Sequence, residues 1–399
     1  MSLDRKIDRP SAYEIIPNRL FYTALRTLPK ETPTSTFFCI DSQLVYWNFF
    51  LDFGPLNLGQ LYRFCSTLNS KLKSEQHKKK AIYYYSGTHG QKRANAVFLI
   101  CAWKMLYMGS SAEDAFEIFK TMYPGFPPFH DASPCACTYN LSILDCLMGL
   151  QKAKQYKFFD FDNFDPDEYE YYEQVENGDL NWIAKDKFVA FAGPHNSREV
   201  SREGYRTLTP DDYIPYFKKT GVKLVVRLNK KYYDERKFIN AGIRHAEIYY
   251  LDGSCPPVRI LKKVIESFES TDGAIAVHCK AGLGRTGTCI GCYIMKHYKF
   301  TAAEIIGWMR ICRPGCVIGP QQHFMKEMEQ QMWQEGEAMR ARVQRNLPPP
   351  SQSQSDYDEV DSGLKEMSVN STDEAVTGRA GQAEALRTRR EEQQRARRK

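Results

Sequence analysis

One short segment of the chain combines the residue types needed to attack a phosphate ester. His278 to Gly287 reads HCKAGLGRTG, and it places Cys279 and Arg285 at the two ends of a five-residue stretch that contains two glycines. A thiolate is a strong nucleophile, and a guanidinium group can donate two parallel hydrogen bonds to phosphoryl oxygens. The segment therefore predicts a phosphate-binding loop with a nucleophile at its base.

The residues on either side of this loop predict a buried strand before it and a helix after it. Ala274 to Val277 is a short apolar run, and Thr286 to His297 contains no proline. Backbone N–H groups and the helix dipole favour an anion at a helix N-terminus. The pKa of a free cysteine is about 8.5, and it falls to roughly 3.5–7.5 beside helix N-termini and cations. We therefore expect Cys279 to be a thiolate at neutral pH.

The loop residues and one neighbour complete the predicted cradle. We expect phosphate to be bound by the side chain of Arg285 and by the loop amides, and we include the hydroxyl of Thr286 among the candidate catalytic groups. The predicted phosphate-binding residues are Lys280, Ala281, Gly282, Leu283, Gly284 and Arg285. None of the other eleven cysteines is followed six positions later by an arginine, so the spacing is specific.

Cleavage of an alkyl phosphate also needs a proton for the departing oxygen. Asp252 follows the apolar run Ile248 to Leu251, and it opens the sequence DGSCPP, whose glycine and prolines predict a loop at a strand end. Asp272 is nearer in sequence, but it adjoins the start of the predicted nucleophile strand and should lie at the opposite end from the cradle. Asp252 is therefore the predicted general acid.

Several further motifs narrow the resemblance from a superfamily to one family. The cradle resembles that of the cysteine-dependent protein tyrosine and dual-specificity phosphatases. From about residue 163 to 333 the chain resembles the mitotic-exit dual-specificity phosphatases of the cell-division-cycle-fourteen type. The matching segments are NGDLNW at 177–182, AGPH at 192–195, VRLNK at 226–230, DGS at 252–254, the cradle, and RPG at 313–315 through Gln322. Cys255 and Cys316 depart from the family pattern, which usually has threonine and serine there.

The resemblance implies a mechanism without a metal or other cofactor. Cys279 would attack phosphorus to form a phosphocysteine, which water then hydrolyses. Asp252 would act first as an acid and then as a base, and Gln321 or Gln322 would orient the water. The pair Cys289 and Cys292 has the spacing of zinc ligands, but it falls within the predicted helix and we interpret it as part of the core.

The first half of the chain repeats the second half in a degraded form. The segment from Ile82 to Asn95 has the same order of strand, turn and helix start as the cradle, and Glu113 and Glu304 mark equivalent positions 304 − 113 = 191 residues apart. The same shift places Thr88 opposite Cys279, so this half lacks the thiol. We predict an α/β protein with two tandem dual-specificity-phosphatase-like domains, each with a central mixed sheet flanked by helices.

The predicted boundaries follow from this repeat and from changes in composition. A non-catalytic domain covers 1–150, an acidic linker 151–180, the catalytic domain 181–345, and a disordered basic tail 346–399. The tail begins with prolines and polar residues, and between 380 and 399 it holds seven Lys or Arg against three Glu. Its final basic cluster fits either nuclear import or loose binding to nucleic acid or acidic protein.

An acidic stretch separates the two halves, although the whole chain carries a net charge of +7. No Lys or Arg interrupts it, and its nine acids are Asp160, Asp162, Asp165, Asp167, Glu168, Glu170, Glu173, Glu176 and Asp179. The stretch is either a solvated linker helix or an acidic groove that attracts a basic peptide. The resemblance favours the groove, since the family prefers phosphoserine followed by proline with a later basic residue. Glu170 and Glu173 fit the positions used for that cation.

The expected partners are therefore phosphorylated proteins with basic residues after the phosphosite. A phosphoinositide phosphatase is the rival enzyme, because that class shares the CKAG start of the loop, but it usually has a second lysine where Leu283 stands. A non-catalytic phosphoprotein-binding scaffold is the other alternative, and an intact Cys279, Asp252 and Arg285 argue against it.

Composition and the resemblance also predict where the protein acts. The sequence contains no apolar run long enough for a signal peptide or membrane span, and its twelve cysteines form no disulfide framework. We expect an intracellular protein of the nucleus and cytoplasm, located at the spindle pole, centrosome or basal body. We expect no membrane partner and no nucleic acid, and the sequence leaves the oligomeric state open.

Overall fold

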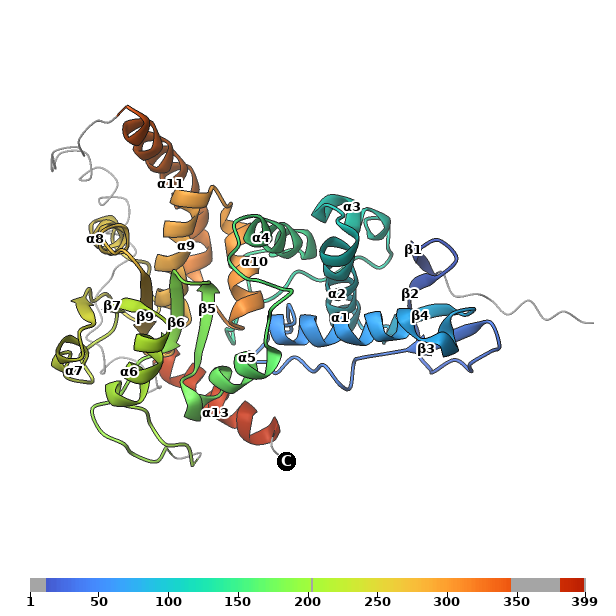
Figure 1. Ribbon diagram of the computed structural model, residues 1–399, viewed down its shortest axis with the longest axis horizontal. Helices are drawn as coiled ribbons and strands as arrows, with labels where there is room; N and C mark the ends of the chain where they lie inside the picture. Colours follow the sequence, from blue (N-terminus) through green and yellow to red (C-terminus); the bar gives the residue numbers. More distant parts are fainter. Residues whose placement is uncertain (1–11, 202–203, 346–380, 398–399) are drawn as a thin grey trace, which may run out of the picture.

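The structure is a computed structural model that describes residues 12–201, 204–345 and 381–397. It contains two α/β units, each with a mixed sheet flanked by helices, as the sequence predicts (Figure 1). Among the helices of these described segments, none has both the length and the apolar character required to cross a lipid bilayer.

The N-terminal unit is built around a four-stranded sheet in the order β1-β2-β4-β3. β2 and β3 both run parallel to β4, and β1 is antiparallel to β2. The strands are β1 (Tyr13–Ile16), β2 (Leu20–Ala24), β3 (Ser35–Phe38) and β4 (Ala81–Ser86). Its helices are α1 (Leu58–Lys73), α2 (Gly90–Met108), α3 (Ala112–Phe116) and α4 (Ile143–Gln155), with short 3-10 turns η1 (Glu75–His77) and η2 (Glu117–Phe119).

The C-terminal unit contains a five-stranded sheet in the order β5-β6-β9-β7-β8, with β9 in the centre. Its strands are β5 (Leu180–Ala184), β6 (Phe188–Ala192), β7 (Val222–Arg227), β8 (Arg244–Glu247) and β9 (Ala274–Cys279). The helices before β9 are α5 (Pro166–Glu173), α6 (Pro210–Lys219), α7 (Arg236–Asn240) and α8 (Val258–Glu269), with η3 (Val175–Asn177). Those after it are α9 (Gly284–Tyr298), α10 (Ala302–Cys312), α11 (Pro320–Gln344) and α13 (Gln382–Arg397).

The strand that leads to the predicted nucleophile is buried along its whole length. Every residue of β9 is buried, because parallel strands lie on both of its edges and helices cover the sheet. This environment explains the continuous apolar run before His278. The predicted order of strand, loop and helix is confirmed, and α9 begins at Gly284, two residues earlier than the sequence indicates.

The two units are joined by a close contact between α4 and α10 (Figure 1). A Cβ atom at Gly149 of α4 would lie only 2.2 Å from the carbonyl oxygen of Glu304 in α10. The side chain of Lys152 also reaches across to Glu304, with a distance of 2.6 Å between Nζ and Oε2. The absence of a side chain at Gly149 therefore lets the two helix backbones approach each other.

The end of the chain differs from the predicted disordered tail. Residues 346–380 and 398–399 lie outside the described residues, but Gln382–Arg397 form helix α13. One face of this helix is buried, at positions that follow helical spacing: Ala383, Leu386, Arg390, Glu391 and Gln394. A polar helix of this length is marginal by itself in water. Here its arginines pair with carboxylates of the C-terminal unit, which composition alone does not reveal.

Candidate active site

The predicted cradle lies where the central strand of the C-terminal sheet meets helix α9. Cys279 is the last residue of β9 and is 2% exposed. Gly282, in the middle of the loop, has φ +67°, and a Cβ atom there would lie 2.0 Å from the carbonyl oxygen of Phe191. Only glycine fits this position, so the loop can turn tightly beneath the N-terminus of α9.

A buried arginine, Arg313 of the RPG segment, braces the loop from behind. Arg313 donates hydrogen bonds to the carbonyl oxygens of Ala281 at 3.0 Å and Gly282 at 2.8 Å. It also pairs with Asp179 at 2.9 Å and donates to Asn181. Because the two carbonyls are held on this side, the loop cannot easily change its turn. The Arg-Pro-Gly break at 313–315 was the sequence signal for this brace.

The predicted arginine and the predicted general acid lie next to each other. Arg285 is 3% exposed, and its Nη2 atom lies 3.0 Å from Oδ1 of Asp252. Its other terminal nitrogen donates to the carbonyl oxygen of Tyr250 at 3.0 Å. Burial acts to lower the pKa of Arg285, but the charges of Cys279 and Asp252 outweigh it, so the pKa is raised. The guanidinium therefore stays charged beside the predicted nucleophile.

The histidine before the nucleophile is neutral and structural. Burial lowers the pKa of His278 to about 3. Its Nδ1–H donates to the carbonyl oxygen of Cys279 at 2.9 Å, so Nε2 accepts from the hydroxyl of Tyr233 at 2.8 Å. The oxygen of Tyr233 then accepts from Nε2 of His245, also at 2.8 Å. We assign these tautomers from the network, which fixes the end of β9.

The two candidate glutamines lie in different surroundings. The Gln321 amide lies against the loop, where its Oε1 would be 2.7 Å from a Cβ on Gly284, and its Nε2 donates to the carbonyl oxygen of Ser254 at 3.1 Å. Gln322 instead accepts a hydrogen bond from the buried Arg310 at 2.7 Å. Gln321 is thus the glutamine that borders both the cradle and the Asp252 loop.

Thr286 follows the arginine at the start of α9 and is fully buried. Its hydroxyl oxygen has no hydrogen-bond partner within the described parts of the chain. A buried hydroxyl without a partner is costly, so this group is available to a ligand or to a neighbouring sulfur.

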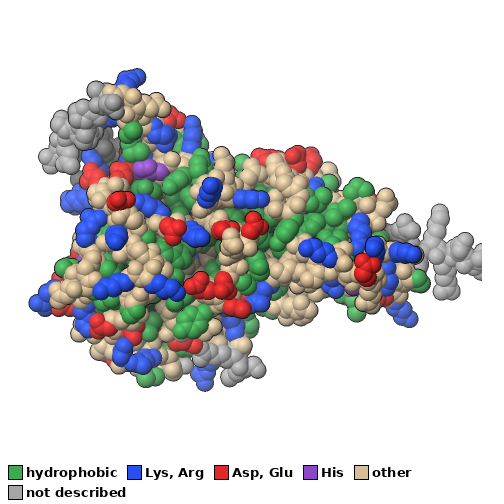
Figure 2. All heavy atoms as spheres, in the orientation of Figure 1, with side chains coloured by type: hydrophobic (Ala, Val, Ile, Leu, Met, Phe, Trp, Pro, Cys, Tyr) green, Lys and Arg blue, Asp and Glu red, His purple; other side chains and the backbone are tan. Residues whose placement is uncertain are grey.

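The acidic stretch is partly a helix surface and partly a buried groove wall. Figure 2 shows carboxylate side chains gathered over α5. Glu173 and Asp179 are each 5% exposed. Glu170, by contrast, pairs with Arg63 of α1, with distances of 2.6 and 2.8 Å between their side chains. Of the two predicted cation-binding residues, Glu173 therefore faces the groove, and Glu170 ties α5 to α1.

Helix α13 lies near α5 in Figure 1, and its residues contact both the cradle and the buried acids. At its start, the backbone N–H of Ala383 donates to Oδ2 of Asp252 at 3.0 Å. Glu384 pairs with Lys280 of the loop at 2.5 Å. Further along, two arginines approach the buried acids: Arg390 lies 3.1 Å from Asp179, and Arg397 lies 3.4 Å from Glu173.

Aromatic side chains beside the groove also contact the arginines of α13. The guanidinium of Arg390 lies over the ring of Phe49 at 5.9 Å, and that of Arg397 lies over Trp47 at 5.7 Å. Carboxylates and aromatic faces together form a surface suited to cations. The N-terminal unit supplies these rings, so both halves of the chain contribute to the groove.

A thiol and a guanidinium at the two ends of a tight loop, between a central parallel strand and a helix, define the cysteine-dependent phosphatase class of site. Two family models match the chain: "Dual specificity protein phosphatase, N-terminal half" over residues 14–153 and "Dual specificity phosphatase, catalytic domain" over residues 213–332.

Similarity to curated proteins narrows the class further. The chain is 50% identical over 359 residues to human dual specificity protein phosphatase CDC14A, and this match covers 90% of the chain and 60% of that protein. It is 44% identical over 368 residues to human CDC14C, covering 92% of the chain and 81% of that protein. The chain belongs to the CDC14 family of dual specificity protein phosphatases. It spans about 60% of the length of the CDC14A relative.

Solved structures also match part of the chain. A crystal structure of Tk-PTP in the active form is 20% identical, covers 38% of this chain and 96% of its own, and has a TM-score of 0.32.

Proposed function

We propose that this chain is a protein phosphatase that hydrolyses phosphoserine, phosphothreonine and phosphotyrosine through a phosphocysteine intermediate. The observation that carries the proposal is the convergence of Cys279, Arg285 and Asp252 on one glycine-containing loop. These three groups supply a nucleophile, a phosphate clamp and a proton donor, which together suffice for this chemistry.

In the first step, the thiolate of Cys279 attacks phosphorus and the bond to the substrate oxygen breaks. Asp252 enters this step protonated and gives its proton to the departing oxygen, while Arg285 and the loop amides stabilise the equatorial oxygens. The dephosphorylated protein leaves with its hydroxyl restored. The products of this step are a phosphocysteine and an Asp252 carboxylate.

In the second step, water attacks the phosphocysteine. Asp252, now ionised, accepts a proton from the water, and Gln321 orients it from its position beside Gly284. The phosphorus–sulfur bond breaks, inorganic phosphate forms, and the thiolate of Cys279 is regenerated. We assign the orientation of the attacking water to Gln321 and not to Gln322, because the side chain of Gln322 is held by Arg310.

We further propose that the groove selects substrates with a basic residue after a phosphoserine-proline pair. The supporting observation is that Glu173 and Asp179 already hold arginine side chains of α13. A substrate lysine or arginine would bind the same carboxylates after displacing the arginines of α13. Such substrates are those of cyclin-dependent kinases, and we propose that the protein reverses that phosphorylation in cell-cycle, cytokinesis or ciliary control.

The same surroundings disfavour a phosphoinositide headgroup. Lys280, the loop cation shared with that class, is paired with Glu384. Buried acids line the approach, and they would repel a second phosphate. We place the protein in the nucleus and cytoplasm, including the spindle pole, centrosome or basal body.

A panel of substrates tests the proposed specificity. The purified chain is assayed on a phosphoserine-proline peptide with a downstream lysine, the same peptide with alanine there, an aryl phosphate and a soluble phosphoinositide. We expect Glu173→Gln to lower kcat/KM about tenfold on the lysine peptide, since a charged hydrogen bond is lost, and to spare the alanine peptide and the aryl phosphate. Glu168→Gln, an exposed acid on the same helix, is the matched control.

Two results would reject these proposals separately. Equal losses on all substrates in Glu173→Gln would assign Glu173 a structural role and remove the groove from substrate selection. A wild-type preference for the phosphoinositide over every peptide would reject protein phosphatase function itself.

A further inference from the structure

A loop of the N-terminal unit collects several residues that can bind a metal ion. Residues 130–140 leave and rejoin the fold at Phe129 and Leu141, which form a β-bridge in which the N–H of Phe129 donates to the carbonyl oxygen of Leu141 at 2.8 Å. The loop contains His130, Asp131, Cys135 and Cys137. Because both of its ends are pinned, the loop loses little entropy when its side chains take up a ligand.

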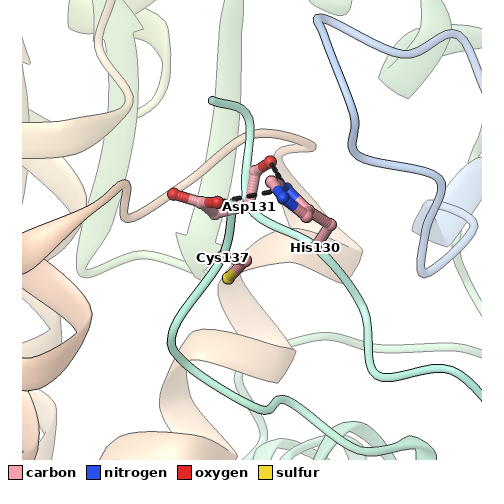
Figure 3. A group of neighbouring side chains, drawn as sticks. All are labelled: His130, Asp131 and Cys137. Atoms are coloured by element: carbon pink, nitrogen blue, oxygen red, sulfur yellow. Dashed lines mark hydrogen bonds and ion pairs between the residues drawn. The ribbon is translucent and has the colours of Figure 1, made fainter. Parts of the chain in front are cut away.

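Three of these side chains come together. Figure 3 shows His130, Asp131 and Cys137 from the two sides of the loop, and their donor atoms lie within 4.8 Å of one another. Nδ1 of His130 is 3.2 Å from Oδ1 of Asp131. Around a tetrahedral zinc ion, bonds of about 2.0–2.3 Å place neighbouring ligand atoms about 3.3–3.8 Å apart. The three donor atoms therefore reach this spacing with shifts of about 1.5 Å or less.

The charges at this position favour a cation. The side chain of Asp131 is 1% exposed, and among the described residues its only ionic partner is His130, which carries a charge only when protonated. The carboxylate accepts hydrogen bonds from Ser133 at 2.9 Å and from the backbone N–H of Gly319 at 2.6 Å. Two neutral donors do not balance a buried negative charge as a metal ion would.

The histidine has a free ring position as well. Nε2 of His130 is buried and makes no hydrogen bond to any described residue. Nδ1 lies 2.7 Å from the backbone carbonyl oxygen of Asp131, which can only accept, so Nδ1 carries the ring proton and Nε2 offers the lone pair that a metal ion would take. A buried ring nitrogen without a partner is uncommon in folded proteins and marks a position where a ligand or ion is expected.

We propose that His130, Asp131 and Cys137 form a zinc site, with water at the fourth position. Imidazole, carboxylate and thiolate are the ligands that zinc takes in proteins, and the sulfur disfavours magnesium and calcium. On binding, Cys137 releases its thiol proton to solvent and gives up its hydrogen bond to the carbonyl oxygen of Tyr139. The resulting site is independent of the phosphatase mechanism.

A zinc ion at this site would also stabilise a contact between the N-terminal and C-terminal units. Oδ2 of Asp131 holds the N–H of Gly319, which directly precedes α11 and the glutamine that borders the cradle. A zinc ion on the other oxygen of Asp131 would fix this carboxylate and hence the turn at Gly319. Zinc is therefore expected to stabilise the pairing of the loop with the catalytic half.

The test is a zinc titration of the full chain against a chromophoric chelator. It is carried out in a Cys279→Ser background, so that the cradle thiolate does not bind the metal. We expect one equivalent of zinc to bind, Cys137→Ser and His130→Gln to weaken binding by at least about tenfold, and Cys135→Ser, an exposed thiol of the same loop, to change it little. Cobalt in place of zinc should give a thiolate charge-transfer band that Cys137→Ser removes.

Thermal unfolding gives a second readout. Zinc in excess over its dissociation constant should raise the Tm of the Cys279→Ser protein and of its Cys135→Ser derivative, but not that of the Cys137→Ser derivative. The proposal is overturned if no stoichiometric zinc binds, or if Cys135→Ser and Cys137→Ser weaken binding equally. A cobalt complex without the thiolate band would likewise remove Cys137 from the site.

Discussion

The loops that follow β4 and β9 take the same path from a central strand to a helix, but their polar groups have different partners. In the N-terminal unit, the loop N–H of Gly87 donates to the carboxylate of Asp41 at 2.8 Å, so an internal anion takes the place of a ligand. Arg93 donates to the carbonyl oxygens of Pro124 and Gly125 at 2.6 and 3.1 Å.

The corresponding groups of the catalytic half are arranged for a ligand. Arg285 keeps Nη2 beside Asp252, and Thr286 has a buried hydroxyl without a partner among the described residues. The comparison teaches that the strand, loop and helix supply only the frame. A site requires groups that the rest of the fold leaves unsatisfied, together with a thiol. Cys279 ends β9, and the residue that ends β4 is Ser86, two positions before the Thr88 that the sequence repeat predicts, so this loop has no thiol at either position.

The largest expected effect is the loss of turnover when the nucleophile of the catalytic loop is replaced. Cys279→Ser should lower turnover by more than about 10⁴-fold while keeping phosphopeptide binding, because only the attacking atom changes. Steady-state assays and a binding titration of the purified variant measure both. Ser86→Cys is the counterpart at the end of β4, and we expect it to add no activity in the Cys279→Ser background. Turnover in that double variant would show that the frame alone suffices.

The next effect concerns proton transfer. Asp252→Asn should slow hydrolysis of a phosphoserine peptide by about 10²- to 10⁴-fold, since an amide cannot donate the proton. The loss should be smaller for an aryl phosphate with an acidic phenol, whose leaving group needs less protonation. Rapid-quench measurement of the first step on both substrates makes the comparison. Equal losses would mean that Asp252 is not the acid.

The brace behind the cradle should matter less than the reacting groups. Arg313→Lys keeps the charge but cannot hold two loop carbonyls and Asp179 together, so we expect kcat/KM to fall by up to about 10²-fold. Arg93→Lys is the control in the N-terminal unit, because Arg93 also holds two backbone carbonyls, and it should leave kcat/KM unaltered. Both variants should show a lower Tm. If Arg93→Lys lost activity to the same extent, the two loops would be coupled and the contrast would fail.

The smallest effect comes from the neutral histidine beneath the nucleophile. Because burial lowers the pKa of His278 to about 3 in the folded state, the unfolded chain binds more protons below pH 6.5. Folding stability should therefore fall as the pH drops below 6.5, by about 2 kcal/mol from this group at pH 5. Urea unfolding at several pH values tests this. His278→Gln should flatten the dependence, and an unchanged slope would contradict it.

The cradle and its flanking elements could be predicted because local sequence determines them. A β-branched apolar run, two glycines and a helix without proline all lie within about 25 residues, and only one backbone path satisfies them. Asp252 was found through the same kind of signal, a strand end followed by glycine and proline.

The residues that the sequence missed depend on contacts between distant parts of the chain. Glu170 fits the expected cation site by position, but Arg63, 107 residues earlier, holds it. Arg313 is marked in the sequence only as part of the RPG segment, and the structure shows that it holds the loop carbonyls of Ala281 and Gly282. Helix α13 has the composition of a disordered tail, and it forms against Glu173, more than 200 residues earlier. Spacing along the sequence carries no information about such pairs.

The close approach of Gly149 to Glu304 has a consequence for how the protein folds. Buried side chains of both units form one continuous apolar cluster, which extends from Ile15 in β1 to Leu386 in α13. A division at the boundary between the units would expose the surfaces of α4 and α10 that this contact covers. The N-terminal unit therefore shares its hydrophobic core with the C-terminal unit. The two units should unfold together in a single cooperative transition, as one domain does.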